Sequence, residues 1–399
     1  MKLPHRMMLA AATGVILGRL IDPTLATSLV PLGNIYLSLL KMVALPLIFF
    51  SLIHGMTSLV NVENLYKMGA RSLMVFVATG IVAALIGIGV SLFVLDPAHG
   101  TILQERTSSF SLKSLLATIF PDNFLGAFTR DSTIQVTLLA LLMSMATLGL
   151  PNEDKQTIIK CIRSIQQLFL NIMKFIMLLS PISIMIFTAH MTANVDKDAL
   201  HILFRFAFSI TIAYLIQYII LGLYIRCISR LPCLPFFSKS IEYQIIALTT
   251  GSSKATLPYT IQVAKNKLGI SDQRASFVLP LGATINMDGL SIYLTLSTLF
   301  FVQAAGIHFS IQDYGILIVA SSCMAIGTAG IPGGALAVLP MILGIWDLPH
   351  DYLPLFIAID PLINMFRSTL NITGDVAVTL VLDRLHGDLE IETYKAKEI

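Results

Sequence analysis

The chain has 399 residues, of which 55% are hydrophobic and only 12% are charged, and its formal net charge is +3. Soluble globular domains carry about 25% charged residues, so this composition excludes an ordinary soluble domain and predicts a polytopic membrane protein. Lys and Arg gather in one alternating set of loops between the apolar segments, for example at Lys67, Arg71, Lys160 and Arg163. The positive-inside rule then predicts an inner or plasma membrane protein with both termini in the cytoplasm.

Apolar segments fill the first part of the chain. They cover about residues 7–21, 34–60, 72–95, 134–150, 166–190 and 201–225. At roughly 1.5 Å per residue, most of these segments are long enough to cross a bilayer as helices. The polar stretch 96–131 is expected to be an external loop.

After Lys239 the apolar segments become interrupted. Segment 241–264 contains TTGSSKATLP, segment 275–304 contains NMDG, and segment 312–347 contains GTAGIPGGA. Gly, Ser and Pro free backbone polar groups at membrane depth, which is tolerated where a cavity or ligand satisfies them. An interrupted segment followed by a polar one occurs twice, and this arrangement predicts a transporter site built from inverted repeats.

The last apolar segment, 353–382, carries polar side chains on one face. At ~100° per residue these side chains fall within an arc of about 100°: Asp360, Asn364, Arg367, Ser368, Asn371 and Asp375. Polar groups in a membrane helix indicate function by default. The pattern favours a binding site for an anion beside a small cation. The alternative is a buried structural ion pair between Arg367 and one of the Asp residues.

Each interruption also has a functional and a plain interpretation. Residues 251–258 suit a hairpin tip whose helix N-terminus offers N–H groups to an anion, or they form a simple turn. Asp288 and the unwound backbone beside it supply the oxygen ligands that Na⁺ prefers, or they form a capped kink. Residues 327–335 are too rich in Gly for a stable helix and suit a mobile lid, or an external loop.

Several motifs together resemble one family. SSKATLP, LPLGATINMDG, GTAGIPGG and RSTLNITGD, with LLKMVALPLIFFSLI upstream, resemble the dicarboxylate/amino acid:cation symporters, the glutamate transporter homologues. The resemblance implies an all-α membrane protein with eight transmembrane helices and two re-entrant helical hairpins in inverted repeats. It also implies an elevator-type transporter that assembles as a homotrimer.

The resemblance divides the chain into a scaffold domain and a transport domain. Residues 1–65 would form scaffold helices 1 and 2, 66–98 transport-domain helix 3, and 99–198 the external loop with scaffold helices 4 and 5. Residues 199–385 would complete the transport domain with helix 6, hairpin 236–266, helix 7, hairpin 310–348 and helix 8. Residues 386–399 would be a cytoplasmic tail.

By the same resemblance, Arg367 would clamp a side-chain carboxylate of the substrate, a role that suits a planar bidentate donor. Asn371 and the backbone of Ser253 would contact the substrate's main carboxylate. The predicted substrate site is completed by Ser368, Asn364, Ser252, Ile331, Gly333, Met287 and Leu290.

The resemblance also implies three cation sites. One would use Asp375 with carbonyls of Gly282, Asn286 and Asn371. A second would use carbonyls of Thr284, Ala325, Ile326 and Thr328. A third would use Asp288 and the Asn286 side chain, with a partner on the third helix near Phe76, Thr79 and Gly80. Thr79 is the oxygen donor we expect there.

Three residues depart from the family pattern. Asn364 replaces the aspartate that pairs with a substrate ammonium in amino-acid transporters, and Gly251 replaces a nearby arginine of archaeal members. Leu290 replaces a threonine that helps hold the distal carboxylate. Arg367 argues for an acidic substrate, and the missing acid argues against an amine. A dicarboxylate such as a C4 acid or 2-oxoglutarate fits both, while glutamate or aspartate remains open.

We therefore predict a secondary active symporter that takes up a small anionic substrate and has no organic cofactor. Asp375 and Asp288 favour Na⁺ as the coupling ion, and the sequence leaves H⁺ open. A substrate-gated anion channel of the same fold is the alternative. An enzyme is not expected, because no nucleophile–base pair is present in the interrupted segments. Beyond membrane lipid and its own copies, no macromolecular partner such as nucleic acid is expected.

Overall fold

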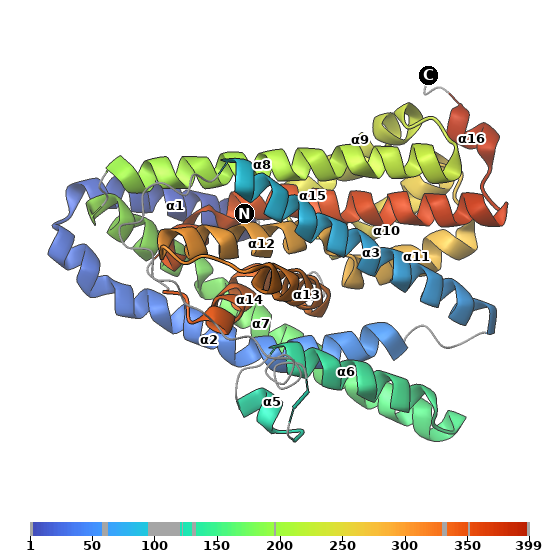
Figure 1. The fold of residues 1–399 in the computed structure, drawn as a ribbon, viewed down its shortest axis with the longest axis horizontal. Helices are drawn as coiled ribbons and strands as arrows, with labels where there is room; N and C mark the ends of the chain where they lie inside the picture. The colour runs from blue at the N-terminus through green and yellow to red at the C-terminus, as the bar shows by residue number, and fades with distance from the viewer. Residues whose placement is uncertain are drawn as a thin grey trace.

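The structure is a computed structural model that describes residues 3–57, 63–94, 120–121, 123–129, 133–194, 197–328, 333–349 and 352–396. In these ranges all regular structure is helical. Figure 1 shows long helices that run broadly along the longest axis of the molecule. The predicted all-α architecture is confirmed for this part of the chain.

The helices of the first half correspond to the six predicted apolar segments. They are α1 (Leu3–Leu20), α2 (Pro23–Thr57), α3 (Glu63–Val94), α6 (Thr133–Leu148), α7 (Asn152–Asn194) and α8 (Lys197–Tyr224), with a short α5 at Gly126–Thr129. Helices α2 and α7 begin earlier than the apolar stretches 34–60 and 166–190, because their helical backbone continues into more polar sequence. Most of the predicted external loop 96–131 lies outside the described residues.

The helices of the second half are shorter and arranged in pairs. They are α9 (Leu234–Thr250) and α10 (Ser253–Asn266), α11 (Asp272–Ile285) and α12 (Asp288–Ala304), α13 (Ile311–Gly327) and α14 (Gly334–Leu343), followed by α15 (Leu353–His386) and α16 (Ile391–Lys395). A π-helical turn, Ile225–Ser229, extends α8, and a 3₁₀ turn, Gly344–Trp346, follows α14.

Each predicted interruption falls where a helix ends. Gly251 ends α9 with the left-handed angles φ 60° and ψ 28°, which glycine adopts without a Cβ penalty. Asn286 and Met287 leave helical geometry between α11 and α12. The third interruption lies between α13 and α14, where residues 329–332 are outside the described ranges.

The helices pack in two groups. Helices α1, α2 and α6 lie along α7, and α2 also packs against α6. In Figure 1, α2 and α6 lie toward the lower part of the view and α1 lies at the upper left. Helices α3, α8, α9, α10, α11 and α13 pack against α12 or α15, and α14 joins α12 to α2. The two groups meet where α7 contacts α15 and where α13 and α14 contact α2. This packing places α15 and its polar face in the interior of the molecule.

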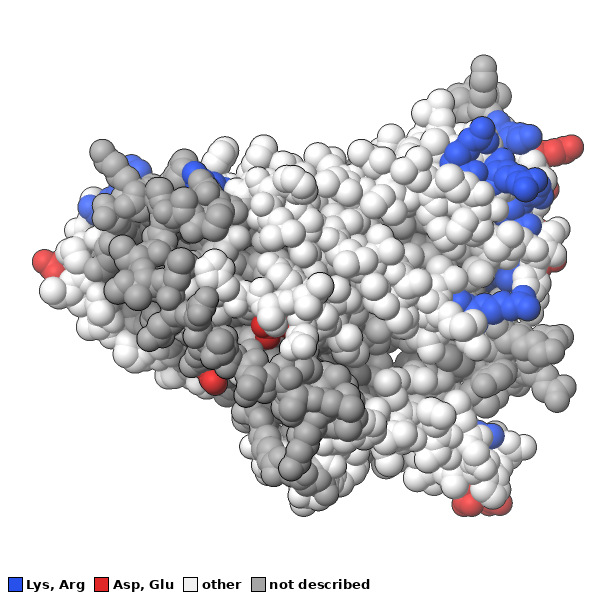
Figure 2. Space-filling view, viewed as in Figure 1, with Lys and Arg blue, Asp and Glu red and all other residues white. Residues whose placement is uncertain are grey.

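Several described helices are long and apolar enough to cross a membrane. They are Pro23–His54, Met68–Val94, Asn152–His190, Phe204–Ser229 and Asp272–Ala304. Figure 2 shows Lys and Arg gathered at the end of the molecule that carries α16, and a broad middle zone of the visible face with few charges. This distribution is the one expected of an integral membrane protein.

The end of the molecule that carries α16 is held together by buried polar contacts. The Lys239 ammonium donates to the backbone carbonyls of Lys267 (2.9 Å), Thr393 (2.7 Å) and Tyr394 (2.9 Å). Arg274 pairs with Asp383 at 2.7 Å, and both side chains are buried. These contacts fix the bases of α9, α10 and α11 to the C-terminal segment. The tail predicted at 386–399 therefore includes a packed helix, α16.

Candidate functional site

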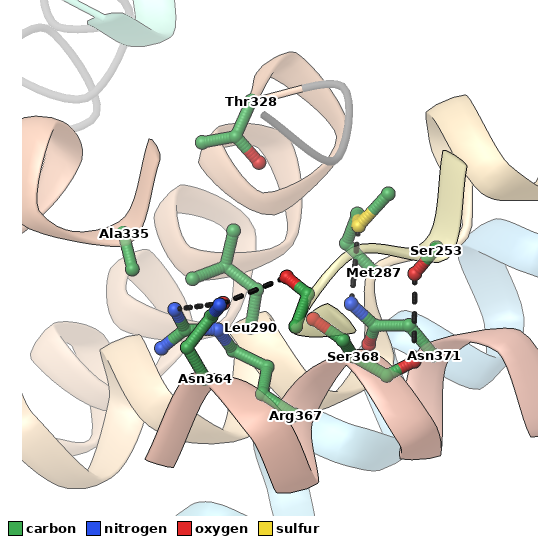
Figure 3. A pocket seen from close by; sticks show the side chains of 10 residues that line it. Ser253, Met287, Leu290, Thr328, Ala335, Asn364, Arg367, Ser368 and Asn371 are labelled. Carbon is green, nitrogen blue, oxygen red and sulfur yellow. Dashed lines mark hydrogen bonds between the residues drawn. The ribbon is translucent and has the colours of Figure 1, made fainter. Parts of the chain in front are cut away.

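A cavity lies where the tip of the α9–α10 pair, the α11–α12 break and the polar face of α15 converge. The space that atoms do not fill there is about 350 Å³, part of which is open to solvent, and Figure 3 shows its lining side chains. The lining residues are Gly251, Ser253, Met287, Leu290, Thr328, Ala335, Asn364, Arg367, Ser368 and Asn371. Segments up to 120 positions apart in the sequence thus build one small site.

Arg367 supplies the positive charge of this site. Its Nη1 donates to Oδ1 of Asp360 at 3.1 Å, and its Nη2 donates to Oδ1 of Asn364 at 2.8 Å. Its guanidinium carbon lies 4.9 Å from the ring centroid of Tyr293, a cation–π distance. Arg367 and Asp360 are both buried. A guanidinium has five N–H groups, so the contacts with Asp360 and Asn364 do not use all of them.

The ion pair of the alternative interpretation is therefore present, with Asp360 as the partner of Arg367. It does not exclude a binding role, because Arg367 also lines the cavity. Removing either member of a buried pair leaves an uncompensated charge, which is strongly destabilising. Asp360 had no predicted role, and the structure shows it holding the guanidinium in place.

Asn364 joins α15 to the tip of the α9–α10 pair. Its Nδ2 donates to the Gly251 carbonyl at 2.9 Å, while its Oδ1 accepts from Arg367. Ser253 lies beside it, and its hydroxyl donates to the Ser368 carbonyl across 3.4 Å. Ser252, predicted as a substrate residue, caps α10 by accepting from the Ala255 N–H and is absent from the cavity lining.

The α11–α12 break presents backbone to α15. Oδ1 of Asn371 accepts the Gly289 N–H at 2.8 Å, and its Nδ2 lies 3.1 Å from the sulfur of Met287. The Tyr214 hydroxyl donates to the Gly289 carbonyl at 3.1 Å. These contacts hold Met287 and Asn371 together at the cavity wall.

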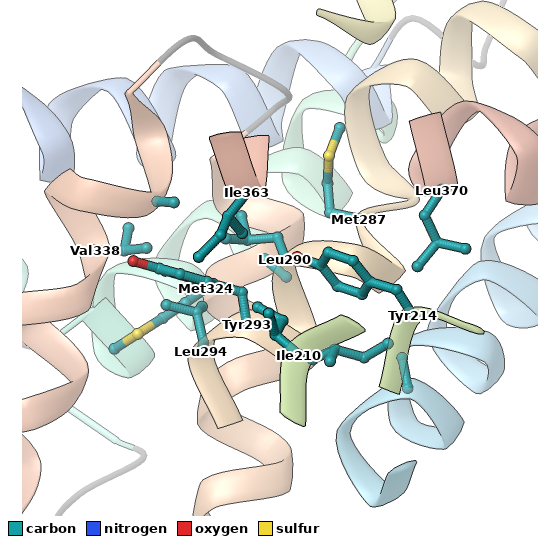
Figure 4. Close-up of a cluster of buried hydrophobic side chains, with 14 of the residues drawn as sticks. Ile210, Tyr214, Met287, Leu290, Tyr293, Leu294, Met324, Val338, Ile363 and Leu370 are labelled. Atoms are coloured by element: carbon teal, nitrogen blue, oxygen red, sulfur yellow. The ribbon is translucent and has the colours of Figure 1, made fainter. Parts of the chain in front are cut away.

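Apolar side chains enclose the site on its remaining sides. Figure 4 shows Tyr214, Leu290 and Tyr293 together with Met324, Val338 and neighbouring residues. Leu290 is 4% exposed. Arg367 is only 4% exposed in this surrounding, so its charge acts in a medium of lower dielectric constant than bulk water.

The predicted cation residues form a second polar cluster beside the cavity. Asn286 donates through Nδ2 to Oδ1 of Asp375 at 2.9 Å and accepts from Thr79 Oγ1 at 3.2 Å. Oδ2 of the fully buried Asp375 has no hydrogen-bond partner among the described residues. A Cβ added at Gly282 would lie 2.6 Å from Oδ1 of Asp375, so this close approach requires glycine.

Asp288 is the second buried acid of the cluster. Gln217, on α8, donates to its Oδ2 at 2.8 Å. Oδ1 of Asp288 has no hydrogen-bond partner in the part of the chain that the structure describes. Two orphaned carboxylate oxygens in a dry interior are costly without a cation, so the residues fit a small hard cation that takes oxygen ligands.

The remaining predicted cation ligands lie at the ends of α11 and α13. Thr284 is in the last turn of α11, and Ala325 and Ile326 are in the last turn of α13. The Thr328 hydroxyl donates to the Ala325 carbonyl at 2.8 Å, and Thr328 lines the cavity. Their carbonyl role stays a prediction.

The predicted substrate-site residues that remain are Gly333 and Ile331, which belong to the expected lid. Gly333 begins α14 with φ 78°, and a Cβ there would meet the sulfur of Met177 at 2.4 Å. Gly333 is absent from the cavity lining, whereas Ala335 is part of it. Ile331 lies outside the described residues.

Two residues of the site were not predicted from the sequence. Gln217 contacts Asp288, and Tyr293 lies over Arg367. Gln217 is a single Gln in an apolar helix, which places a polar group at membrane depth. Only this feature of the sequence could have identified it as a candidate site residue. Tyr293 belongs to a uniformly buried helix and has no distinguishing pattern.

Comparisons with known proteins identify the family of the chain. The chain matches the sequence profile of the sodium:dicarboxylate symporter family over residues 3–385. It is 29% identical to C4-dicarboxylate transport protein 4 of Bradyrhizobium diazoefficiens, over 96% of this chain and 89% of that one. It is 24% identical to the proton/glutamate-aspartate symporter of Escherichia coli (95% and 92%) and 27% identical to an L-cystine uptake protein of Bacillus cereus (91% and 83%). The chain belongs to the sodium:dicarboxylate symporter family and is a transporter, not an enzyme.

Proposed function

We propose that the protein is a symporter that uses a Na⁺ gradient to take up a small dicarboxylate without an amine. The observation that carries this proposal is the charge of the cavity. Among the residues that the structure describes, the lining includes Arg367 and contains no Asp or Glu. A carboxylate would meet the free N–H groups of Arg367, whereas an ammonium would find no carboxylate at the wall.

The hydrogen bonds of Asn364 support a substrate that has no amine. The carbonyl oxygen of Asn364 already accepts from Arg367 at 2.8 Å and its amide nitrogen donates to Gly251. An ammonium placed beside Asn364 would also lie close to the guanidinium, which repels it. The relatives named for C4-dicarboxylate transport favour the same substrate class.

An acidic amino acid is the second candidate. One relative is named as a proton/glutamate-aspartate symporter, and this name supports an acidic amino acid as the alternative substrate. In such a case the oxygen of Asn364 would accept one hydrogen bond from the ammonium, without a compensating charge.

Asp375 and Asp288 would hold the coupling cation, with help from Asn286, Thr79 and neighbouring carbonyls. A bound cation would supply positive charge that offsets these buried carboxylates. Asn371 lines the cavity and contacts Gly289 and Met287, which stand on either side of Asp288 in the chain. Cation binding at Asp288 and substrate binding in the cavity should therefore favour each other reciprocally. We propose Na⁺ over H⁺ because Thr79, the Asn286 side chain and the neighbouring backbone carbonyls could supply the oxygen ligands that a hard cation prefers.

The family fold completes the proposal. The chain would cross an inner or plasma membrane eight times, with both termini in the cytoplasm and two re-entrant hairpins, α9–α10 and α13–α14. The group around α15 would form the transport domain and move against a scaffold of α1, α2, α6 and α7. Three copies would form the homotrimer.

A competition experiment in proteoliposomes tests the substrate and the cation together. Uptake of labelled succinate would be challenged with malate, 2-oxoglutarate, glutamate and aspartate, while Na⁺ and H⁺ gradients are imposed separately. We expect dicarboxylates to compete strongly and amino acids weakly, with Na⁺ driving accumulation. Strong competition by aspartate or glutamate alone would assign an amino-acid substrate, and uptake that never exceeds the external concentration would indicate a channel.

A further inference from the structure

The tip of the α9–α10 pair is tied to α15 by few contacts. Between residues 250–253 and α15 the described chain shows two hydrogen bonds, Asn364 Nδ2 to the Gly251 carbonyl at 2.9 Å and Ser253 to the Ser368 carbonyl at 3.4 Å. The first is the shorter, and it comes from a residue that also contacts Arg367. The base of the same pair is held by the buried Lys239 contacts.

The chemistry of the neighbours fixes the orientation of the Asn364 amide. A backbone carbonyl can only accept, so Nδ2 must face Gly251. A guanidinium can only donate, so Oδ1 must face Arg367. Aspartate could accept from Arg367 but could not donate to the carbonyl, and a leucine could do neither. Asparagine is therefore suited to join an acceptor to a donor at this place.

Figure 3 shows Asn364 and Arg367 side by side on one face of α15, with the cavity above them. We propose that Asn364 is a positioning residue that couples substrate occupancy at Arg367 to closure of the α9–α10 tip. When the tip is closed, the Gly251 carbonyl orients the amide, and the amide orients the guanidinium toward the substrate. Because linkage is reciprocal, a carboxylate bound at Arg367 favours the closed tip.

This inference rests on the proposed function, since it needs an acidic substrate at Arg367. It gives Asn364 a positioning role in addition to its effect on substrate choice through the lack of a negative charge. It also implies that Asn364→Asp alone does not convert the site to amino acids, because the new carboxylate would face the Gly251 carbonyl oxygen across a hydrogen-bond distance.

The test follows the accessibility of the tip in the full-length protein. The four cysteines, all free in the structure, are replaced by serine, and Ala255→Cys places one thiol on an exposed position of α10. Its modification rate by a maleimide is measured with and without succinate in Na⁺. Succinate affinity is measured in parallel by calorimetry.

Asn364→Asp and Asn364→Leu are compared with a matched control, Gln244→Leu. Gln244 also links the pair to α15, by donating to Thr373 Oγ1 at 3.1 Å, but without contacting Arg367. We expect succinate to slow labelling in the parent and in Gln244→Leu. In both Asn364 variants the protection should disappear and succinate affinity should fall about tenfold, while stabilisation by Na⁺ is retained.

Succinate protection of parental size in Asn364→Asp and Asn364→Leu would overturn the coupling. So would equal loss of protection in Gln244→Leu, because the effect would then belong to any contact between the pair and α15. If the parent binds none of the dicarboxylates or acidic amino acids, the proposed function fails together with this inference.

Discussion

Gly282 gives a prediction that can be worked out from distances. In Gly282→Ala the new methyl carbon would lie 2.6 Å from Oδ1, 2.7 Å from Cγ and 3.0 Å from Cβ of Asp375. Overpacking a tight interior costs about 1–3 kcal/mol. If the carboxylate moves away instead, it loses the 2.9 Å hydrogen bond from Asn286, worth about 1.5–3 kcal/mol for a charged acceptor.

We therefore expect Gly282→Ala to lower the free energy of unfolding by about 2–4 kcal/mol and to displace Asp375 from its position. The displaced carboxylate should bind Na⁺ more weakly. A ligand stabilises the folded state by RT ln(1 + [L]/Kd), so each tenfold loss of affinity removes about 1.4 kcal/mol of Na⁺-dependent stabilisation at saturating Na⁺.

Thermal unfolding of the purified protein in NaCl and in choline chloride measures both effects. Gly89→Ala on α3 is the matched control, since a Cβ there meets no atom within 4 Å. Gly89→Ala should keep the melting temperature and its response to Na⁺. If Gly282→Ala also kept the full response to Na⁺, the assignment of Asp375 to a cation site would be wrong.

Substitutions at Arg367, Tyr293 and Lys239 test the site and the base of the fold. Arg367→Ala should abolish succinate binding in calorimetry, and unchanged binding would contradict the clamp. Tyr293→Phe should keep succinate affinity, whereas Tyr293→Leu should weaken it roughly 2–5-fold because a cation–π contact is worth about 0.5–1 kcal/mol; equal effects would place the role in the hydroxyl. Lys239→Met should lower the free energy of unfolding by about 2–4 kcal/mol because it leaves buried carbonyls without a donor, measured in denaturant. Lys265→Met, which breaks a more exposed ion pair, should cost less than about 1 kcal/mol, and similar losses in both would refute the buried role.

The polar face of α15 was predictable because helical periodicity alone places Asp360, Asn364, Arg367 and Asn371 together. The breaks at Gly251 and at Asn286 were predictable for a different reason. Small and polar residues interrupt a helix in an apolar segment, and the backbone N–H and C=O groups at the interruption lose their helical hydrogen bonds. A continuous membrane helix would keep these groups paired. Both signals are local, and the structure shows the predicted helix ends at these places.

The contacts between distant segments were not predictable from local pattern. Gln217 lies 71 positions from Asp288, and Lys239 lies 155 positions from Tyr394. Tertiary packing decides which polar group meets which, so a lone Gln or Lys in sequence names no partner. The sequence also treats 386–399 as a tail, because the five residues of α16 are too few to show a helical period.

The central claim is that a cation gradient drives accumulation of an amine-free dicarboxylate through the Arg367 site. The most direct measurement is succinate uptake into proteoliposomes loaded with choline and diluted into NaCl. The account predicts that internal succinate rises above its external concentration and that dissipating the Na⁺ gradient removes the rise. Internal succinate that only reaches its external concentration in the Na⁺ gradient, or equal accumulation driven by a proton gradient in choline, would contradict it.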